Sequence, residues 1–264
     1  MGTILDQIIE KKRGEVVRLK ELDQPKSIEP TTKKRSLIDK LSKATEVSII
    51  AEFKRSSPSK GDINPNLDPK EQVKFYIESG ADAVSILTDQ PFFKGSFADL
   101  MAARSVINQP ILCKDFMIDP IQIDYASSSG ADIILLIAAA LDEEKLQGLY
   151  QYAKAKNLEV LMEVHNEAEL EKVLKTGNRL IGVNNRDLKT FHIDLATTER
   201  LAKAIKDSGA YLISESGMKS KEDVERVVEA GANGILVGET FMTHPNVSQV
   251  LKEMKVSLKG VCSQ

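Results

Sequence analysis

The sequence predicts an α/β fold in which eight parallel strands and the helices between them close into a (β/α)8 TIM barrel. A motif of a small residue, glycine, a small residue and Asp or Asn precedes an apolar run at 79–82, 129–132 and 230–233. Its glycines follow one another at intervals of 50 and then 101 residues. These intervals are close to multiples of about 25, the length that a strand, a helix and two loops require.

Two of the expected strands, 133–137 and 234–237, are apolar throughout instead of alternating with polar residues. Parallel strands covered on both faces of the sheet have this pattern. A doubly wound open sheet is the main alternative. Eight evenly spaced units in about 215 residues fit a closed barrel better, because such barrels usually contain roughly 250 residues.

A helical extension is predicted to precede the barrel. Residues 4–22 place apolar side chains at near-helical spacing among charged ones, which is typical of an amphipathic helix. Ser36, with Asp39 three positions later, resembles a capping box and predicts a short second helix. We therefore expect an extension of residues 1–46 packed on a barrel of residues 47–264, as a single domain overall.

The barrel strands follow from the repeat and from the apolar runs. We expect them at 48–53, 82–87, 110–113, 132–137, 159–163, 180–184, 210–215 and 234–238. Amphipathic helices are expected between them, among others at 69–79, 143–155, 167–176, 197–207 and 220–230.

Composition restricts the partners and the compartment. The net charge of −3 and the pI near 5.8 give no electrostatic reason to expect nucleic acid or an anionic membrane as a partner, since both require a concentrated basic face. We expect a small-molecule partner and a monomer. The two cysteines, Cys113 and Cys262, fit neither a disulfide framework nor a zinc site, and residues 133–141 are too short an apolar run to span a bilayer. A cytoplasmic location is the simplest expectation.

The carboxyl ends of the predicted strands are rich in charged and amide side chains, and in a barrel these ends meet at one rim. Alternation along the first strand puts Glu52 and Lys54 on one face and Phe53 on the other. Any single residue of this kind is ordinarily a solvated strand end or an ion pair. Jointly they predict a catalytic mouth, to which five strands contribute Glu52, Lys54, Lys114, Glu163, Asn184, Arg186, Glu215 and Ser216.

A phosphate site is predicted at the loops after the last two strands, where barrels often bind phosphate with backbone N–H groups. Gly217 and Gly238 occupy these loops, and glycine allows the backbone to approach an anion closely. Glu239 would contribute its N–H while its carboxylate turns to solvent. Ser57, in the first loop, either binds the phosphate or caps that loop.

Residues 52–61, with the sequence Glu-Phe-Lys-Arg-Ser-Ser-Pro-Ser-Lys-Gly, resemble the signature segment of indole-3-glycerol phosphate synthases. Further segments resemble that family in the same order: 87–88, 92–96, 114–116, 163–165, 182–188, 214–217 and 237–239. The similarity runs from the amino-terminal helices to about residue 255, and the family also carries an extra helical segment before its barrel.

The resemblance implies a carboxy-lyase of tryptophan biosynthesis that needs no metal and no organic cofactor. It would convert 1-(2-carboxyphenylamino)-1-deoxyribulose 5-phosphate into indole-3-glycerol phosphate, with loss of carbon dioxide and water. Lys114 would be the acid, Glu163 the base, Glu52 a second carboxylate, and Lys54 the partner of the leaving carboxylate. Asn184 and Ser216 complete the catalytic set, and the division of steps between the two lysines stays open.

The resemblance also implies a binding surface for the aromatic ring and the sugar. Arg186, with Asn184, would orient the ring substituent and the sugar hydroxyls, and Glu215 would join them. An apolar slot for the ring is expected from Phe93, Phe116, Leu136 and Leu188.

Two alternatives remain. Another phosphosugar barrel, similar to phosphoribosylanthranilate isomerase, would share the phosphate loops but not the pair of Lys114 and Glu163. A non-catalytic sugar-phosphate-binding barrel would have lost at least one catalytic position, and none is lost here. His165, His192 and His244 are too irregularly spaced for a metal site and are interpreted as packed or surface side chains.

Overall fold

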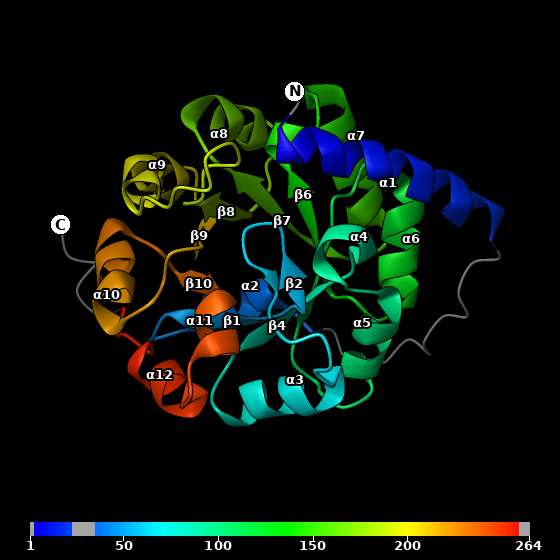
Figure 1. Ribbon diagram of the computed structural model, residues 1–264. Coiled ribbons are helices and arrows are strands. Elements are labelled where there is room, and N and C mark those ends of the chain that lie inside the picture. Colours follow the sequence, from blue (N-terminus) through cyan, green and yellow to red (C-terminus); the bar gives the residue numbers. More distant parts are fainter. Residues whose placement is uncertain (1–2, 23–34, 259–264) are drawn as a thin grey trace.

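The barrel strands are β1 (Ser48–Phe53), β4 (Ala83–Leu87), β5 (Ile111–Lys114), β6 (Ile133–Ile137), β7 (Glu159–Val164), β8 (Leu180–Asn184), β9 (Tyr211–Glu215) and β10 (Gly234–Val237). In the computed structural model, which describes residues 3–22 and 35–258, they form a closed parallel barrel (Figure 1). β1 completes the ring by pairing with both β10 and β4. The predicted closed barrel is confirmed, and each predicted strand end lies within one residue of the observed one.

A ring of helices surrounds the strands: α3 (Pro69–Glu78), α5 (Phe97–Arg104), α6 (Pro120–Ser128), α7 (Glu143–Ala155), α8 (Glu167–Leu174), α9 (Ala196–Asp207), α10 (Lys221–Ala230) and α12 (Val247–Glu253). Shorter helices follow three of the strands: α4 (Gln90–Phe93), η1 (Ala138–Ala140) and α11 (Glu239–Thr243). The five predicted barrel helices are present, with ends within two residues of those expected. Within the described ranges no helix combines the length and apolar character needed to cross a membrane.

Alternation along the strands divides the apolar interior into two layers. Ile49 and Phe53 of β1 face the surrounding helices, whereas Ile50 between them points into the barrel. The inner layer also contains Leu112 and Leu161. Because odd and even positions of a strand face opposite layers, neighbouring residues of one apolar run have different surroundings.

The amino end of the barrel is closed by α2 (Leu37–Leu41), whose Leu37 and Leu41 are buried in the inner layer. Ser36 caps this helix, as predicted. Glu159, at the start of β7, accepts hydrogen bonds from the Ser36 hydroxyl and from the Leu37 N–H at 2.9 Å. A buried carboxylate at a helix amino terminus therefore fixes α2 to the barrel.

The other predicted extension helix, α1 (Ile4–Glu21), lies across α6 (Figure 1). Thr3 and Asp6 form a capping box at its start. Its buried face includes Lys12, whose Nζ lies 2.6 Å from Asp115 and 3.0 Å from Asp89. Both carboxylates belong to loops at the carboxyl ends of strands, so α1 lies at the mouth. The domain boundary at residue 46 stays a prediction, and residues 23–34 lie outside the described ranges.

Candidate active site

A cavity opens at the carboxyl ends of the strands, where the sequence predicts the site. Fourteen of the sixteen predicted site residues line it: Glu52, Lys54, Ser57, Phe93, Lys114, Phe116, Glu163, Asn184, Arg186, Leu188, Ser216, Gly217, Gly238 and Glu239. Glu215 lies directly beneath the lining and contacts Lys114. Leu136 does not reach the cavity. The fold therefore brings together residues that are up to 187 positions apart in the sequence, from Glu52 to Glu239.

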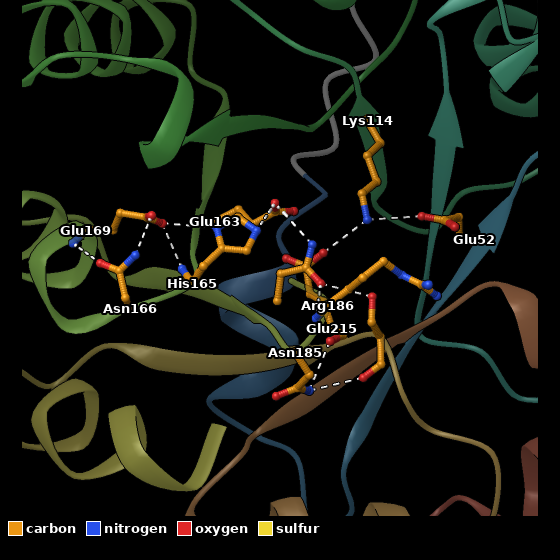
Figure 2. A network of polar contacts seen from close by, with 11 residues as sticks. Glu52, Lys114, Glu163, His165, Asn166, Glu169, Asn185, Arg186 and Glu215 are labelled. Atoms are coloured by element: carbon orange, nitrogen blue, oxygen red, sulfur yellow. Dashed lines mark hydrogen bonds and ion pairs between the residues drawn. The ribbon is translucent and has the colours of Figure 1, made fainter. Parts of the chain in front are cut away.

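Lys114 is at the centre of the charged groups (Figure 2). Its Nζ lies 3.0 Å from Glu215 Oε2 and 3.1 Å from Glu52 Oε2. Glu52 also accepts from Lys54 Nζ at 2.5 Å. Phe53 packs toward the helices, so Glu52 and Lys54 both point into the mouth, as alternation predicts. One buried carboxylate thus bridges two lysines.

These contacts determine which groups carry protons. Burial opposes ionisation of Glu52, but Lys114 and Lys54 hold its pKa at about 2. Burial also opposes the charge of Lys114, yet Glu215 and Glu52 raise its pKa above the ordinary value. Burial raises the pKa of Glu215 to about 7, because the attraction of Lys114 is offset by the negative charges of Glu163 and Glu52. At neutral pH the site therefore contains a protonated lysine beside a buried carboxyl group whose ionisation its surroundings oppose.

Glycines make room for two of these carboxylates. A Cβ atom on Gly182 of β8 would lie 2.1 Å from Glu215 Oε1. A Cβ atom on Gly238 would lie 2.3 Å from Glu52 Oε1 and 3.0 Å from Lys54 Nζ. Both distances to oxygen are shorter than any ordinary contact between atoms. The two carboxylates can therefore occupy these positions only because residues 182 and 238 are glycines.

Glu163 and Asn184 form a second polar group across the mouth. Asn184 Nδ2 donates to Glu163 Oε1 at 3.3 Å, and its Oδ1 accepts from the Ser216 hydroxyl at 3.0 Å. The Arg186 N–H donates to the same Oδ1 at 3.1 Å. Ser216 has a φ of 63°, which is uncommon for a residue other than glycine. The amide of Asn184 is therefore oriented by the loops that follow β8 and β9.

The position of the Glu239 carboxylate corrects one expectation. It does not turn to solvent: Oε1 lies 3.0 Å from Lys60 Nζ, and Oε2 lies 3.4 Å from the Arg186 guanidinium. The two cations come from the loops that follow β1 and β8, and each pairs with a different oxygen of the Glu239 carboxylate. Lys60 belongs to a small hairpin of β2 (Ser56–Ser57) and β3 (Gly61–Asp62), which the sequence did not predict.

Leu136 corrects another expectation. It is fully buried in the layer that faces the helices, whereas its neighbours Leu135 and Ile137 line the cavity. The run 133–137 is apolar throughout, so its sequence contains no alternation from which the inward face could be recognised. The other slot residues lie as expected, with the Phe93 and Phe116 ring centroids 6.0 Å apart.

Two further groups contact the site although they were not predicted to do so. Ile4, Leu5 and Ile8 of α1 line the cavity. His165, interpreted as a packed or surface residue, lies 3.3 Å from Glu163 through its Nε2. The sequence contained a signal for His165, because it stands two positions after Glu163, where the extended chain of β7 ends, and alternate residues of an extended chain share a face.

The described residues offer neither a cluster of metal ligands nor an exposed thiol. Within residues 3–22 and 35–258, no group of three or more His, Cys, Asp or Glu side chains could hold a metal ion. Cys113 is fully buried among apolar residues, and burial raises the pKa of its thiol. Cys262 lies outside the described residues.

Comparison with solved structures shows the fold alone. Thiamine phosphate pyrophosphorylase from Pyrococcus furiosus superposes with a TM-score of 0.58 over 79% of this chain and 93% of that one, at 16% identity. Similarity at this identity says nothing about the reaction.

Comparison with known sequences is more specific. The family model described as indole-3-glycerol phosphate synthase matches residues 5–254. Proteins named indole-3-glycerol phosphate synthase from Bacillus cereus and Bacillus mycoides are each 52% identical to this chain, over 98% of its length and 100% of theirs. With the site geometry above, these matches establish that the chain belongs to the indole-3-glycerol phosphate synthase family, enzymes of tryptophan biosynthesis.

Proposed function

We propose that the chain is a cofactor-free carboxy-lyase that closes the pyrrole ring of indole-3-glycerol phosphate from 1-(2-carboxyphenylamino)-1-deoxyribulose 5-phosphate. The observation that carries this proposal is Lys114, held between Glu52 and Glu215 at 3.1 and 3.0 Å. A protonated, oriented ammonium group in a largely buried mouth suits a general acid.

Ring closure requires the aromatic carbon that bears the carboxylate to attack the ketone of the sugar chain. Lys114 gives its proton to the ketone oxygen as the new bond forms, which leaves a hydroxyl group. Lys54, beside Glu52 at the rim, pairs with the substrate carboxylate. Loss of that carboxylate as carbon dioxide returns its bonding electrons to the ring.

Dehydration completes the reaction. One of the two lysines, Lys54 or Lys114, gives a proton to the new hydroxyl, which leaves as water, and a base removes a proton from the adjacent carbon so that the pyrrole double bond can form. Burial opposes ionisation of Glu163, but His165, Lys114 and Asn184 hold its pKa below the ordinary value. Glu163 is therefore an ionised carboxylate at neutral pH and suits the role of base.

The phosphate and the aromatic ring of the substrate each have a binding surface in this proposal. We assign the phosphate to the loops of Ser57, Gly217, Gly238 and Glu239, all of which line the cavity. The aromatic ring lies against Phe93, Phe116 and Leu188, with Arg186 and Asn184 at the polar substituents.

We also propose that the enzyme acts as a monomer in the cytoplasm, on a small molecule and without nucleic acid or membrane. The net charge of −3 supports this proposal. Only three large apolar side chains are exposed among the described residues: Val17, Leu22 and Phe75. Light scattering of the purified protein tests the oligomeric state.

The test is the appearance of indole fluorescence when purified protein meets the substrate in buffer with EDTA. Lys114→Ala and Glu163→Gln should each lower kcat by about 10²-fold or more. Binding of a product analogue should change little, because neither substitution alters the phosphate loops. Lys175→Ala, an exposed lysine paired with Glu143, is the matched control and should behave as wild type.

Two results of these experiments would contradict the proposed function. Turnover that survives Lys114→Ala would contradict the acid assignment. A folded wild-type protein that binds the substrate and produces no indole would favour the non-catalytic barrel.

A further inference from the structure

His165 lies directly after β7, between two carboxylates at the edge of the mouth (Figure 2). Its ring Nε2 is 3.3 Å from Glu163 Oε1, and its Nδ1 is 3.0 Å from Glu169 Oε2. The imidazole is 12% exposed and the side chain of Glu163 4%. An imidazole can offer an N–H to carboxylates on both sides only when both of its nitrogens are protonated.

Glu169 has a fixed orientation at the start of α8. Its Oε2 also accepts from the His165 backbone N–H at 2.8 Å, and its Oε1 accepts from Asn166 Nδ2 at 2.7 Å. Asn166 caps α8 and accepts from the Glu169 N–H at 3.0 Å. The carboxylate behind the ring is therefore held on both oxygens, which leaves the ring a single orientation toward Glu163.

We propose that His165, oriented by Glu169, is a positioning residue that holds the Glu163 carboxylate ionised and aimed into the mouth. This inference rests on the proposed function, in which Glu163 is the base. The other groups that face Glu163 are Lys114 from β5, Asn184 from β8 and Glu215 from β9.

The charges around Glu163 support this role. Burial favours its neutral form, and of the groups that oppose burial His165 acts more strongly than Lys114 or Asn184 in holding the pKa down. Burial also disfavours the imidazolium, but Glu163 and Glu169 raise the pKa of His165 to about 10. The ring is therefore charged throughout the neutral range. Its Nε2 forms an ion pair with Glu163 Oε1 at 3.3 Å, and this contact opposes the effect of burial on the carboxylate.

The test is the pH profile of kcat for His165→Gln, which keeps a polar donor but removes the charge. The acid limb, which reports the base in the substrate complex, should move upward by about one pH unit or more, with KM little changed. Glu169→Gln should move the limb in the same direction by less. His244→Gln, the same substitution at an exposed histidine, should leave the profile unchanged.

Measurement of Glu163→Gln alongside separates the two proposals. If that variant retains wild-type turnover, the base assignment of the proposed function fails, and this inference fails with it. If Glu163→Gln is inactive and the limb of His165→Gln coincides with that of wild type, only the role of His165 is overturned. If His165→Gln lowers kcat equally at every pH and leaves the acid limb unmoved, the role of His165 is likewise overturned. Should His165→Gln not fold, an unmoved limb in Glu169→Gln overturns the proposal.

Discussion

At the mouth of the barrel, two positions without side chains control where the charged groups lie. Gly182 leaves the space in which Glu215 Oε1 is placed, and Gly238 does the same for Glu52. Both carboxylates contact Lys114, so an added methyl group would act on the proposed proton donor through its partners. Catalysis is sensitive to such displacement, since about 1 Å at a reacting group can change a rate by about 10²-fold.

Gly182→Ala should therefore lower kcat by about tenfold or more, because the new Cβ would overlap Glu215 and displace Lys114. Steady-state kinetics by indole fluorescence measures this. The control is Gly148→Ala in α7, where no atom lies within 4 Å of the added Cβ. The control should retain activity and gain about 0.5–1 kcal/mol in the free energy of unfolding. Full activity in Gly182→Ala would contradict this prediction, because it would show that Glu215 can accommodate the added Cβ atom without displacing Lys114.

Among the elements, α1 depends most on a single buried contact. Lys12 is fully buried and lies 2.6 Å from Asp115, 3.0 Å from Asp89 and 2.9 Å from Glu15. These carboxylates raise the pKa of Lys12 despite its burial, so it is charged. Two of them lie in loops of the mouth, and the contact therefore joins an element outside the barrel to the loops that carry Lys114 and α4.

Lys12→Met should lower the free energy of unfolding by about 3–5 kcal/mol, because it leaves buried carboxylates without their counter-charge. Urea unfolding of both variants measures the effect. Lys20→Met is the matched control on the same helix: its ion pair with Asp119 is 2.7 Å long, but its side chain is 54% exposed. Such a pair contributes about 1 kcal/mol or less. Equal losses in the two variants would contradict the special role of Lys12.

Long elements could be predicted from the sequence because apolar runs and helix-ending glycines mark them locally. Gly80, Gly130 and Gly231 all have positive φ at the helix-to-strand turns that the repeat predicts. Short elements such as β2 and β3 could not be predicted, because contacts from distant residues maintain them. Arg55, beside that hairpin, makes two 2.7 Å hydrogen bonds to Asp99 of α5, and no local pattern indicates this pair.

At the scale of the whole molecule, the two ends of the barrel differ in the side chains that they carry. The amino end of the barrel is closed by α2 and apolar side chains, whereas the carboxyl end carries the charged groups. That the charges share one rim could be predicted, since parallel strands all end on the same side. Their pairing could not, because it depends on side-chain distances: Glu239 contacts Lys60 and Arg186, and His165 contacts Glu163.

The charged rim should make stability depend on pH. The folded-state pKa of Glu52 is about 2, below its ordinary value of 4.5. A depressed carboxyl pKa contributes stability that is complete above the unfolded value and is lost as pH falls through the folded one. The difference in unfolding free energy between wild type and Glu52→Gln should therefore shrink between pH 4.5 and about 2. Urea unfolding over this range measures it, and a constant difference would contradict the prediction.

Because Ile4, Leu5 and Ile8 of α1 form part of the cavity wall, helix docking and ligand binding are linked equilibria. A ligand that touches the docked helix binds less tightly when the helix is undocked, and binding must in turn favour docking by the same factor. In the limit where the undocked form does not bind at all, the apparent dissociation constant equals the intrinsic one divided by the docked fraction. A helix that contributes none of the reacting groups therefore tunes how much substrate the enzyme needs.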